Sequence, residues 1–195
     1  MIAILTIGFF LILNFGISVF NAWSVGKVLP EIKAMGGFPK IFVYSAIVMS
    51  VCGFTWVYLF IITFIMGTVG ILGDAEVLAM LELGYLVIIF PVLGAGLILT
   101  VGSYITLWKQ RNFKSGAIAG WNTFAMAYNT YNAVRLVPKS VTSVLKTFGS
   151  GNKNKNTIII LGLIFAIFGG GLTAYAIMRW SAKKHSQKMI SKHNL

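Results

Sequence analysis

The sequence predicts an all-α fold, a polytopic transmembrane helix bundle, and two observations carry that prediction. The first is that the charged residues lie between long stretches that contain none. About 20 consecutive apolar residues are enough for a helix to cross the ~30 Å hydrocarbon core of a bilayer. The charge-free stretches that reach this length are 1–26, 41–73, 83–108 and 156–178.

The second observation is the composition. Hydrophobic residues make up 57% of the chain and charged residues only 10%, whereas soluble domains contain about 25% charged residues. Within hydrocarbon every backbone polar group must be satisfied internally, which leaves helices or closed barrels. Barrel strands alternate apolar and polar residues, but the apolar runs here are unbroken, as in Leu86–Phe90. Helices are therefore predicted, in a single transmembrane domain over 1–195.

The first two helices are expected over about 2–22 and 41–67. No Lys or Arg precedes Lys27, so the first apolar run is predicted to be an uncleaved membrane helix rather than a secretory signal. The connection 23–40 contains Pro30 and a Gly-Gly pair, which predict a short amphipathic piece and a turn. The second apolar run is longer than a bilayer requires. Gly67, Gly70 and Gly73 favour an early end of this helix, near residue 67.

The third helix is expected over about 77–108 and the fourth over about 157–180. Glu82 is expected in an extramembrane or interfacial first turn of the third helix, and Pro91 within that helix predicts a kink. The fourth helix is followed by residues 181–195, which are expected to form a basic, solvated tail.

A fifth helix is predicted between the third and the fourth. Residues 121–127 align without gaps onto 128–134, and an offset of seven is about two helical turns, so similar side chains share a face. The pattern predicts an amphipathic helix over about 116–135, with an aromatic stripe beside a polar flank. The stripe consists of Trp121, Phe124, Tyr128 and Tyr131, and the flank of Asn122, Thr123, Asn129 and Thr130.

Three interpretations of this amphipathic helix remain open. It lies in the membrane interface, where Trp and Tyr are favoured; or it packs along the bundle or a neighbouring subunit by its aromatic stripe; or it is a fifth crossing. Polar groups at membrane depth are costly, but they are tolerated where they face protein or water. A fifth crossing would therefore turn its Asn/Thr flank toward a pore or other helices.

Lys and Arg in short loops mark the cytoplasmic side of a membrane protein. The turn at 73–76 contains two acids and no basic residue, whereas both flanking connections are basic. Models with four and with five crossings satisfy this rule equally well. Both place 23–40 and 109–114 inside and the acidic turn outside, and they differ on residues 135–155 and on the tail.

The sequence shows no catalytic or metal-binding pattern. His185 and His193 occur in the basic tail without a nearby carboxylate, and no positioned acid/base pair or phosphate-binding loop is found. We therefore expect no enzyme activity, no cofactor and no bound metal. Gly170 and Ala174 have the small-xxx-small spacing that lets membrane helices approach closely.

These observations favour a non-enzymatic subunit or scaffold of a larger membrane assembly. The alternative is a homo-oligomeric channel or membrane-permeabilising effector. The net charge of +12 predicts attraction to anionic lipid headgroups, and self-association or other membrane subunits are the expected partners. Nucleic acid is disfavoured as a partner, no small-molecule substrate is indicated, and the expected location is a prokaryotic cytoplasmic membrane or a viral membrane. The candidate pore or packing residues are Asn14, Trp121, Asn122, Tyr128, Asn129 and Gly170.

Overall fold

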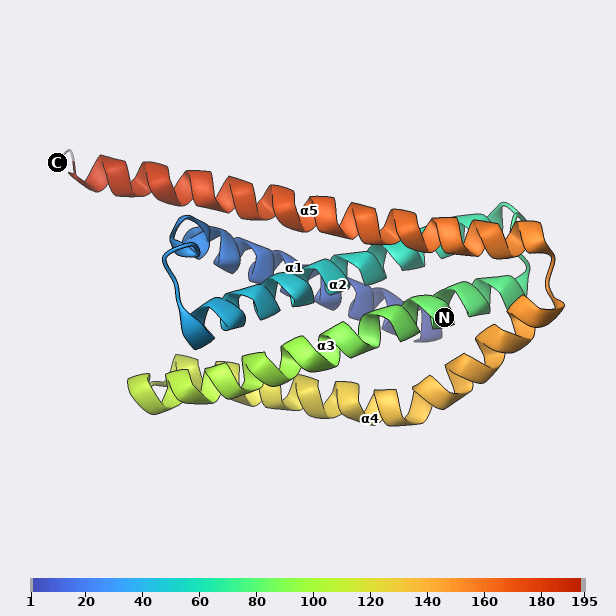
Figure 1. Ribbon diagram of the computed structural model, residues 1–195, viewed down its shortest axis with the longest axis horizontal. Helices are drawn as coiled ribbons and strands as arrows, with labels where there is room; N and C mark the ends of the chain where they lie inside the picture. Colours follow the sequence, from blue (N-terminus) through green and yellow to red (C-terminus); the bar gives the residue numbers. More distant parts are fainter. Residues whose placement is uncertain (1, 194–195) are drawn as a thin grey trace.

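The computed structural model describes the backbone of residues 2–193, and the side-chain surroundings of residues 8, 9 and 11–189. These residues form five α-helices and one 3-10 helix (Figure 1), and the described part of the chain contains no strand. The predicted all-α bundle is confirmed. The elements are α1 Ile2–Val28, η1 Leu29–Glu31, α2 Gly37–Thr68, α3 Asp74–Gln110, α4 Phe113–Ser150 and α5 Lys153–His193.

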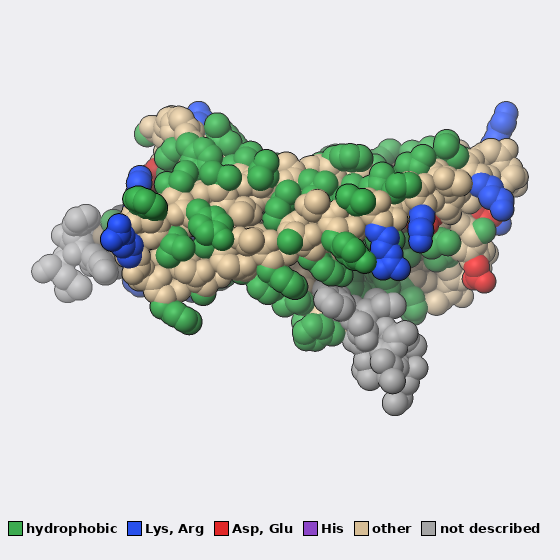
Figure 2. Space-filling view, turned by 90° about the horizontal axis from the view of Figure 1, so that it is seen from below, with side chains coloured by type: hydrophobic (Ala, Val, Ile, Leu, Met, Phe, Trp, Pro, Cys, Tyr) green, Lys and Arg blue, Asp and Glu red, His purple; other side chains and the backbone are tan. Residues whose placement is uncertain are grey.

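Four of the helices contain segments long and apolar enough to cross a membrane, among the described residues. Each of these segments overlaps one of the four predicted membrane helices, and the chain is an integral membrane protein. Figure 2 shows hydrophobic side chains over the middle of one face, with Lys and Arg side chains toward its two ends. The spanning segments are Leu11–Glu31, Gly37–Thr68, Asp74–Gln110 and Lys153–Met189.

Several helices are longer than the sequence predicted. Because α3 begins at Asp74, Glu82 lies in its third turn and not in its first. Helix α4 contains 38 residues and extends to Ser150. Helix α5 continues to His193 and does not end near 180, so residues 181–193 of the predicted basic tail are helical. Since this segment contains no Gly or Pro and several strong helix formers, nothing in it ends the helix.

Helix α2 is at the centre of the bundle and packs against α1, α3 and α5. Each of these three helices is antiparallel to α2, because residue numbers rise along one helix as they fall along its neighbour. On α1, Asn14 lies near Gly53, and the Ser50 hydroxyl donates a hydrogen bond to the Ser18 carbonyl (2.7 Å). For α3 the direction follows from two close pairs, Leu59 with Gly84 and Phe42 with Gly102. For α5 it follows from Ile62 with Gly162 and Thr55 with Gly170.

A tight reversal joins α3 to α4. Arg111 adopts a left-handed conformation (φ 47°) at the end of α3. Asn112 then caps α4, since its side-chain oxygen accepts a hydrogen bond from the Ser115 amide (2.8 Å). A two-residue connection between helices produces antiparallel neighbours, and α4 accordingly packs along α3.

The direction of α5 bears on the number of crossings. Helices α3 and α5 are both antiparallel to α2, so they run in the same direction, and Lys155 at the start of α5 forms an ion pair with Glu76 at the start of α3 (2.7 Å). If α3 and α5 both cross the bilayer, α4 must return the chain across it. The charge-free residues 115–134 span about 30 Å as a helix, the thickness of the hydrocarbon core. The geometry therefore favours the fifth crossing over a helix that lies in the interface.

Five crossings predict which end of each helix faces which side of the membrane. In a Cys52→Ala background, an impermeant thiol reagent should label Asp74→Cys and Asn152→Cys in intact cells. Lys33→Cys and Ser186→Cys should be labelled only after the membrane is opened, because the basic end of the bundle faces the cytoplasm. Protection of position 152 in intact cells would place the start of α5 inside and contradict the fifth crossing.

Candidate functional site

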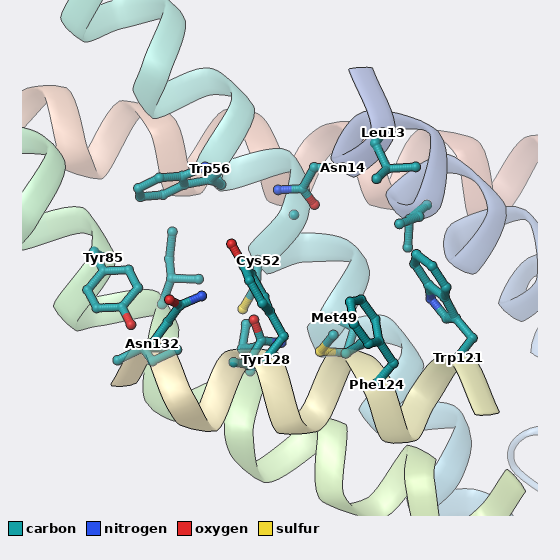
Figure 3. Close-up of a pocket in the computed structure, with 17 residues that line it drawn as sticks. Leu13, Asn14, Met49, Cys52, Trp56, Tyr85, Trp121, Phe124, Tyr128 and Asn132 are labelled. Atoms are coloured by element: carbon teal, nitrogen blue, oxygen red, sulfur yellow. The ribbon is translucent and has the colours of Figure 1, made fainter. Parts of the chain in front are cut away.

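A cavity of about 480 Å³ lies between α1, α2, α3 and α4 (Figure 3). Its residues from α2 and α3 are at 49–56 and 85–92, within the charge-free runs 41–73 and 83–108, so the cavity lies within the membrane-spanning part of the bundle. Ligand sites in proteins commonly have volumes of about 300–1,000 Å³. The residues that α4 contributes are Trp121, Phe124, Ala125, Tyr128, Asn129 and Asn132.

The wall formed by α4 is held in place by its contact with α3. The side of α4 that faces α3 contains small residues, including the buried Ala119 and Ala133. At this contact the side-chain amide of Asn122 donates a hydrogen bond to the backbone carbonyl of Leu99 (3.3 Å). The backbone carbonyl of Asn122 accepts a hydrogen bond from the Thr100 hydroxyl (3.2 Å).

The aromatic stripe of α4 does not form the contact with α3. The Phe124 ring lies 6.1 Å from Trp121 and 6.3 Å from Tyr128, centroid to centroid, and all three side chains line the cavity. Figure 3 shows them directed from α4 toward α1 and α2. Each remains about half exposed or more. The stripe is therefore available to a molecule that enters the cavity.

Helices α1 and α2 form the opposite wall, with Asn14, Cys52 and Trp56 among its residues. Gly53 allows α1 to approach α2 here, because a side-chain carbon on Gly53 would overlap the Ser18 hydroxyl. The Trp56 ring packs edge-on against Tyr85 of α3, with centroids 6.4 Å apart.

Several polar groups in the cavity have no hydrogen-bond partner among the described residues. Within the described residues, the side chains of Asn14, Asn129 and Asn132 take part in no hydrogen bond. The hydroxyl of Tyr85 is buried and also lacks a hydrogen-bond partner. A polar group without a partner in a water-poor environment costs free energy. A ligand that supplies donors and acceptors at this depth would recover that free energy.

The structure brings together four of the six candidate residues named from the sequence. Asn14, Trp121, Tyr128 and Asn129 all line the cavity. Asn122 is directed to α3 instead, and its amide is already hydrogen-bonded within the chain.

The sixth candidate, Gly170, lies outside the cavity at the contact between α5 and α2. A side-chain carbon at this position would lie 2.5 Å from Thr55 Oγ1 and 2.6 Å from Thr55 N. The close approach of the two backbones is therefore within one chain.

Sequence reasoning did not single out Asn132, Trp56 or Tyr85. Asn132 carries a usable signal, since it follows Asn129 by three residues and therefore shares its helix face. Trp56 and Tyr85 carry no such signal in the sequence. They belong to α2 and α3, and they line the cavity only because of how these helices pack against each other and against α4.

The lining is mostly apolar, with a few amide side chains. It consists of aliphatic, aromatic and amide side chains together with the Cys52 thiol, and it contains no Asp, Glu, His, Lys or Arg. Over the described residues, no three His, Cys, Asp or Glu side chains are grouped so as to hold a metal ion. Comparison of the chain with protein-family models, with curated proteins and with solved structures gave no match.

Proposed function

We propose that the chain is a non-enzymatic subunit of a membrane assembly and that a transmembrane helix of another subunit docks over its cavity and places side chains in it. The observation that carries this proposal is the set of amides that line the cavity, Asn14, Asn129 and Asn132, and that have no partner within the described chain. Hydrogen bonds from Asn side chains between membrane helices contribute about 0.6–2 kcal/mol each. A partner helix with polar residues at the level of the cavity would satisfy them.

The packing of α4 supports a helix as the occupant. Among the described residues, α4 packs against α3 but makes no comparable contact with α1 or α2, although α1, α2 and α4 all line the cavity. The layer between α1 and α4 is therefore incomplete within this chain. A helix from another subunit would complete it and would cover the half-exposed rings of Trp121 and Tyr128. Large aromatic side chains contribute strongly to such contacts.

The alternative is a homo-oligomeric channel, and the row of amides is the observation that favours it. Uncharged polar side chains can line a pore, and Asn14 and Asn129 face a common space. Asn122 contributes less to this alternative, because its amide is bonded to the Leu99 carbonyl. In a homo-oligomer, a helix of a second copy would have to occupy or extend the cavity.

Filling the cavity from within the chain tests the subunit proposal. Ala125 lines the cavity, whereas Ala127 is exposed on another part of α4, so Ala125→Trp and Ala127→Trp add equal bulk at different places. We expect the wild type and Ala127→Trp, purified in mild detergent, to have the mass of a defined hetero-complex. Ala125→Trp should have only the 21.3 kDa mass of the single chain.

Two results would contradict the proposal. Equal retention of the partner by both Trp variants would show that the cavity is not the docking site. A symmetric homo-oligomer in place of a hetero-complex would support the channel instead.

A further inference from the structure

A second pocket, of about 390 Å³, lies where the end of α1 meets α5. It is distinct from the cavity between α1, α2, α3 and α4 and belongs to the end of the bundle that carries the basic connections. In Figure 1 the last turns of α5 extend beyond η1 at this end. Its lining includes Trp23 and Lys27 from α1 and Ser181, Lys184, His185 and Lys188 from α5.

The two helices are fixed against each other at the base of this pocket. The Ser181 hydroxyl donates to the Trp23 carbonyl (2.7 Å). Gly26 lies so close to α5 that a side-chain carbon there would lie 2.6 Å from Ser181 Cβ and would overlap the Met178 carbonyl. The walls of the pocket are therefore two helices that already pack tightly, and not a pair of independent chain ends.

The helical continuation of α5 arranges its polar residues on one side. Ser181, Lys184, His185 and Lys188 have the spacing i, i+3, i+4 and i+7, which places them on a single helix face. This face is opposite the last turns of α1, where the Lys27 ammonium lies over the Trp23 ring, 3.3 Å from its centroid. Three lysines from two helices therefore border one pocket.

The described residues that line the pocket include no Asp or Glu. Neighbouring positive charges repel one another and raise the local concentration of anions. Trp23 is of the type that membrane–water interfaces favour, and basic pockets between membrane helices on the cytoplasmic side bind the headgroups of anionic lipids.

We infer that this pocket binds a phosphate group, either that of an anionic phospholipid or that of a soluble phosphate. Lys27 and Lys184 border the pocket from opposite helices and would supply the ammonium groups, that of Lys27 from over the Trp23 ring and that of Lys184 from over the Trp180 ring. The indole of Trp23 lies beside it at the level of the interface. This inference is independent of the subunit proposal, because it concerns other residues, at one end of the bundle.

A comparison of two charge-matched variants tests the pocket. Lys27→Gln/Lys184→Gln removes one lysine from each wall. Lys33→Gln/Lys183→Gln removes the same charge at the same end of the bundle from residues that do not line the pocket. Binding of phosphatidylglycerol to the full chain in detergent is measured by native mass spectrometry. We expect the pocket variant to bind about 10- to 30-fold more weakly than wild type and the control to bind like wild type.

A second titration distinguishes a soluble phosphate from a lipid phosphate. Inorganic phosphate is added to the protein in lipid-free detergent, and its binding is measured as broadening of the ³¹P NMR line. Broadening that disappears in the pocket variant supports the site and assigns it to a soluble phosphate. Binding of phosphatidylglycerol alone, lost in the pocket variant, supports the site and assigns it to lipid. Equal weakening of lipid binding in the two variants, or none in either, would show diffuse attraction to the basic surface and would overturn the inference.

Discussion

Replacing Gly170 with alanine is expected to lower the free energy of unfolding by about 1–3 kcal/mol, the usual cost of adding volume to a well-packed site. The added carbon would lie 2.5 Å from Thr55 Oγ1 and 2.6 Å from Thr55 N. The second of these atoms belongs to the backbone of α2, which cannot rotate away as a side chain can. Helices α2 and α5 would have to separate, and α2 also holds α1 and α3.

The neighbouring residue provides the control for this prediction. A side-chain carbon on Gly171 would meet no heavy atom within 4 Å, so Gly171→Ala only exchanges a poor helix former for a good one, a gain of up to about 1 kcal/mol. Thermal unfolding in detergent, followed by circular dichroism, should therefore show a lower Tm for Gly170→Ala and an equal or higher Tm for Gly171→Ala. Equal shifts would mean that the α2–α5 contact is looser than the structure shows.

The Gly170 contact also shows what a small-residue pattern can predict. The spacing of Gly170 and Ala174 indicated close helix packing, and Ala174 is fully buried. The pattern does not indicate which helix comes close, because the partner is set by the tertiary arrangement. The overlaps that a side chain would make at Gly53, Gly84 and Gly102 involve glycines that the sequence pattern did not single out.

The four apolar helices could be predicted because hydrocarbon imposes a length and a composition on any segment that crosses it. The path of α4 could not be predicted in the same way. Its polar residues make it look like a surface helix, and its direction follows from the reversal at Arg111 and Asn112. It follows equally from the position of Lys155 beside Glu76, a contact between residues 79 positions apart.

The cavity could be predicted only in part, for a related reason. Asn122 and Asn129 are seven residues apart and therefore lie on nearly the same face of α4. That face meets α3 at the level of Asn122, where the amide binds the Leu99 carbonyl. At the level of Asn129 it borders the cavity instead. Periodicity specifies the face of a helix, whereas the neighbour at each depth depends on how the helices cross.

The second large effect is expected from replacing amides of α4. The affinity for the partner helix should fall, whereas the stability of the isolated chain should stay the same or rise. Asn129→Leu/Asn132→Leu removes two amides that have no partner within the described chain. Since an unpaired amide at membrane depth is costly, the isolated chain should unfold at the same temperature as wild type or at a higher one. Its affinity for the partner helix should fall about tenfold or more, because two interhelical hydrogen bonds are lost.

Asn122→Leu is the matched variant, with the same exchange on the same helix and the opposite expectation. It removes the hydrogen bond to the Leu99 carbonyl and leaves that site without its side-chain donor, so the Tm of the isolated chain should fall. Partner affinity, measured on the fraction that remains folded, should change less than in the double variant. The subunit proposal therefore requires the two properties to separate: the double variant loses the partner and keeps its stability, whereas Asn122→Leu loses stability first. If the double variant also unfolds at a lower temperature than wild type, Asn129 and Asn132 stabilise the fold of the chain itself. The proposal that they bind a partner helix would then be wrong.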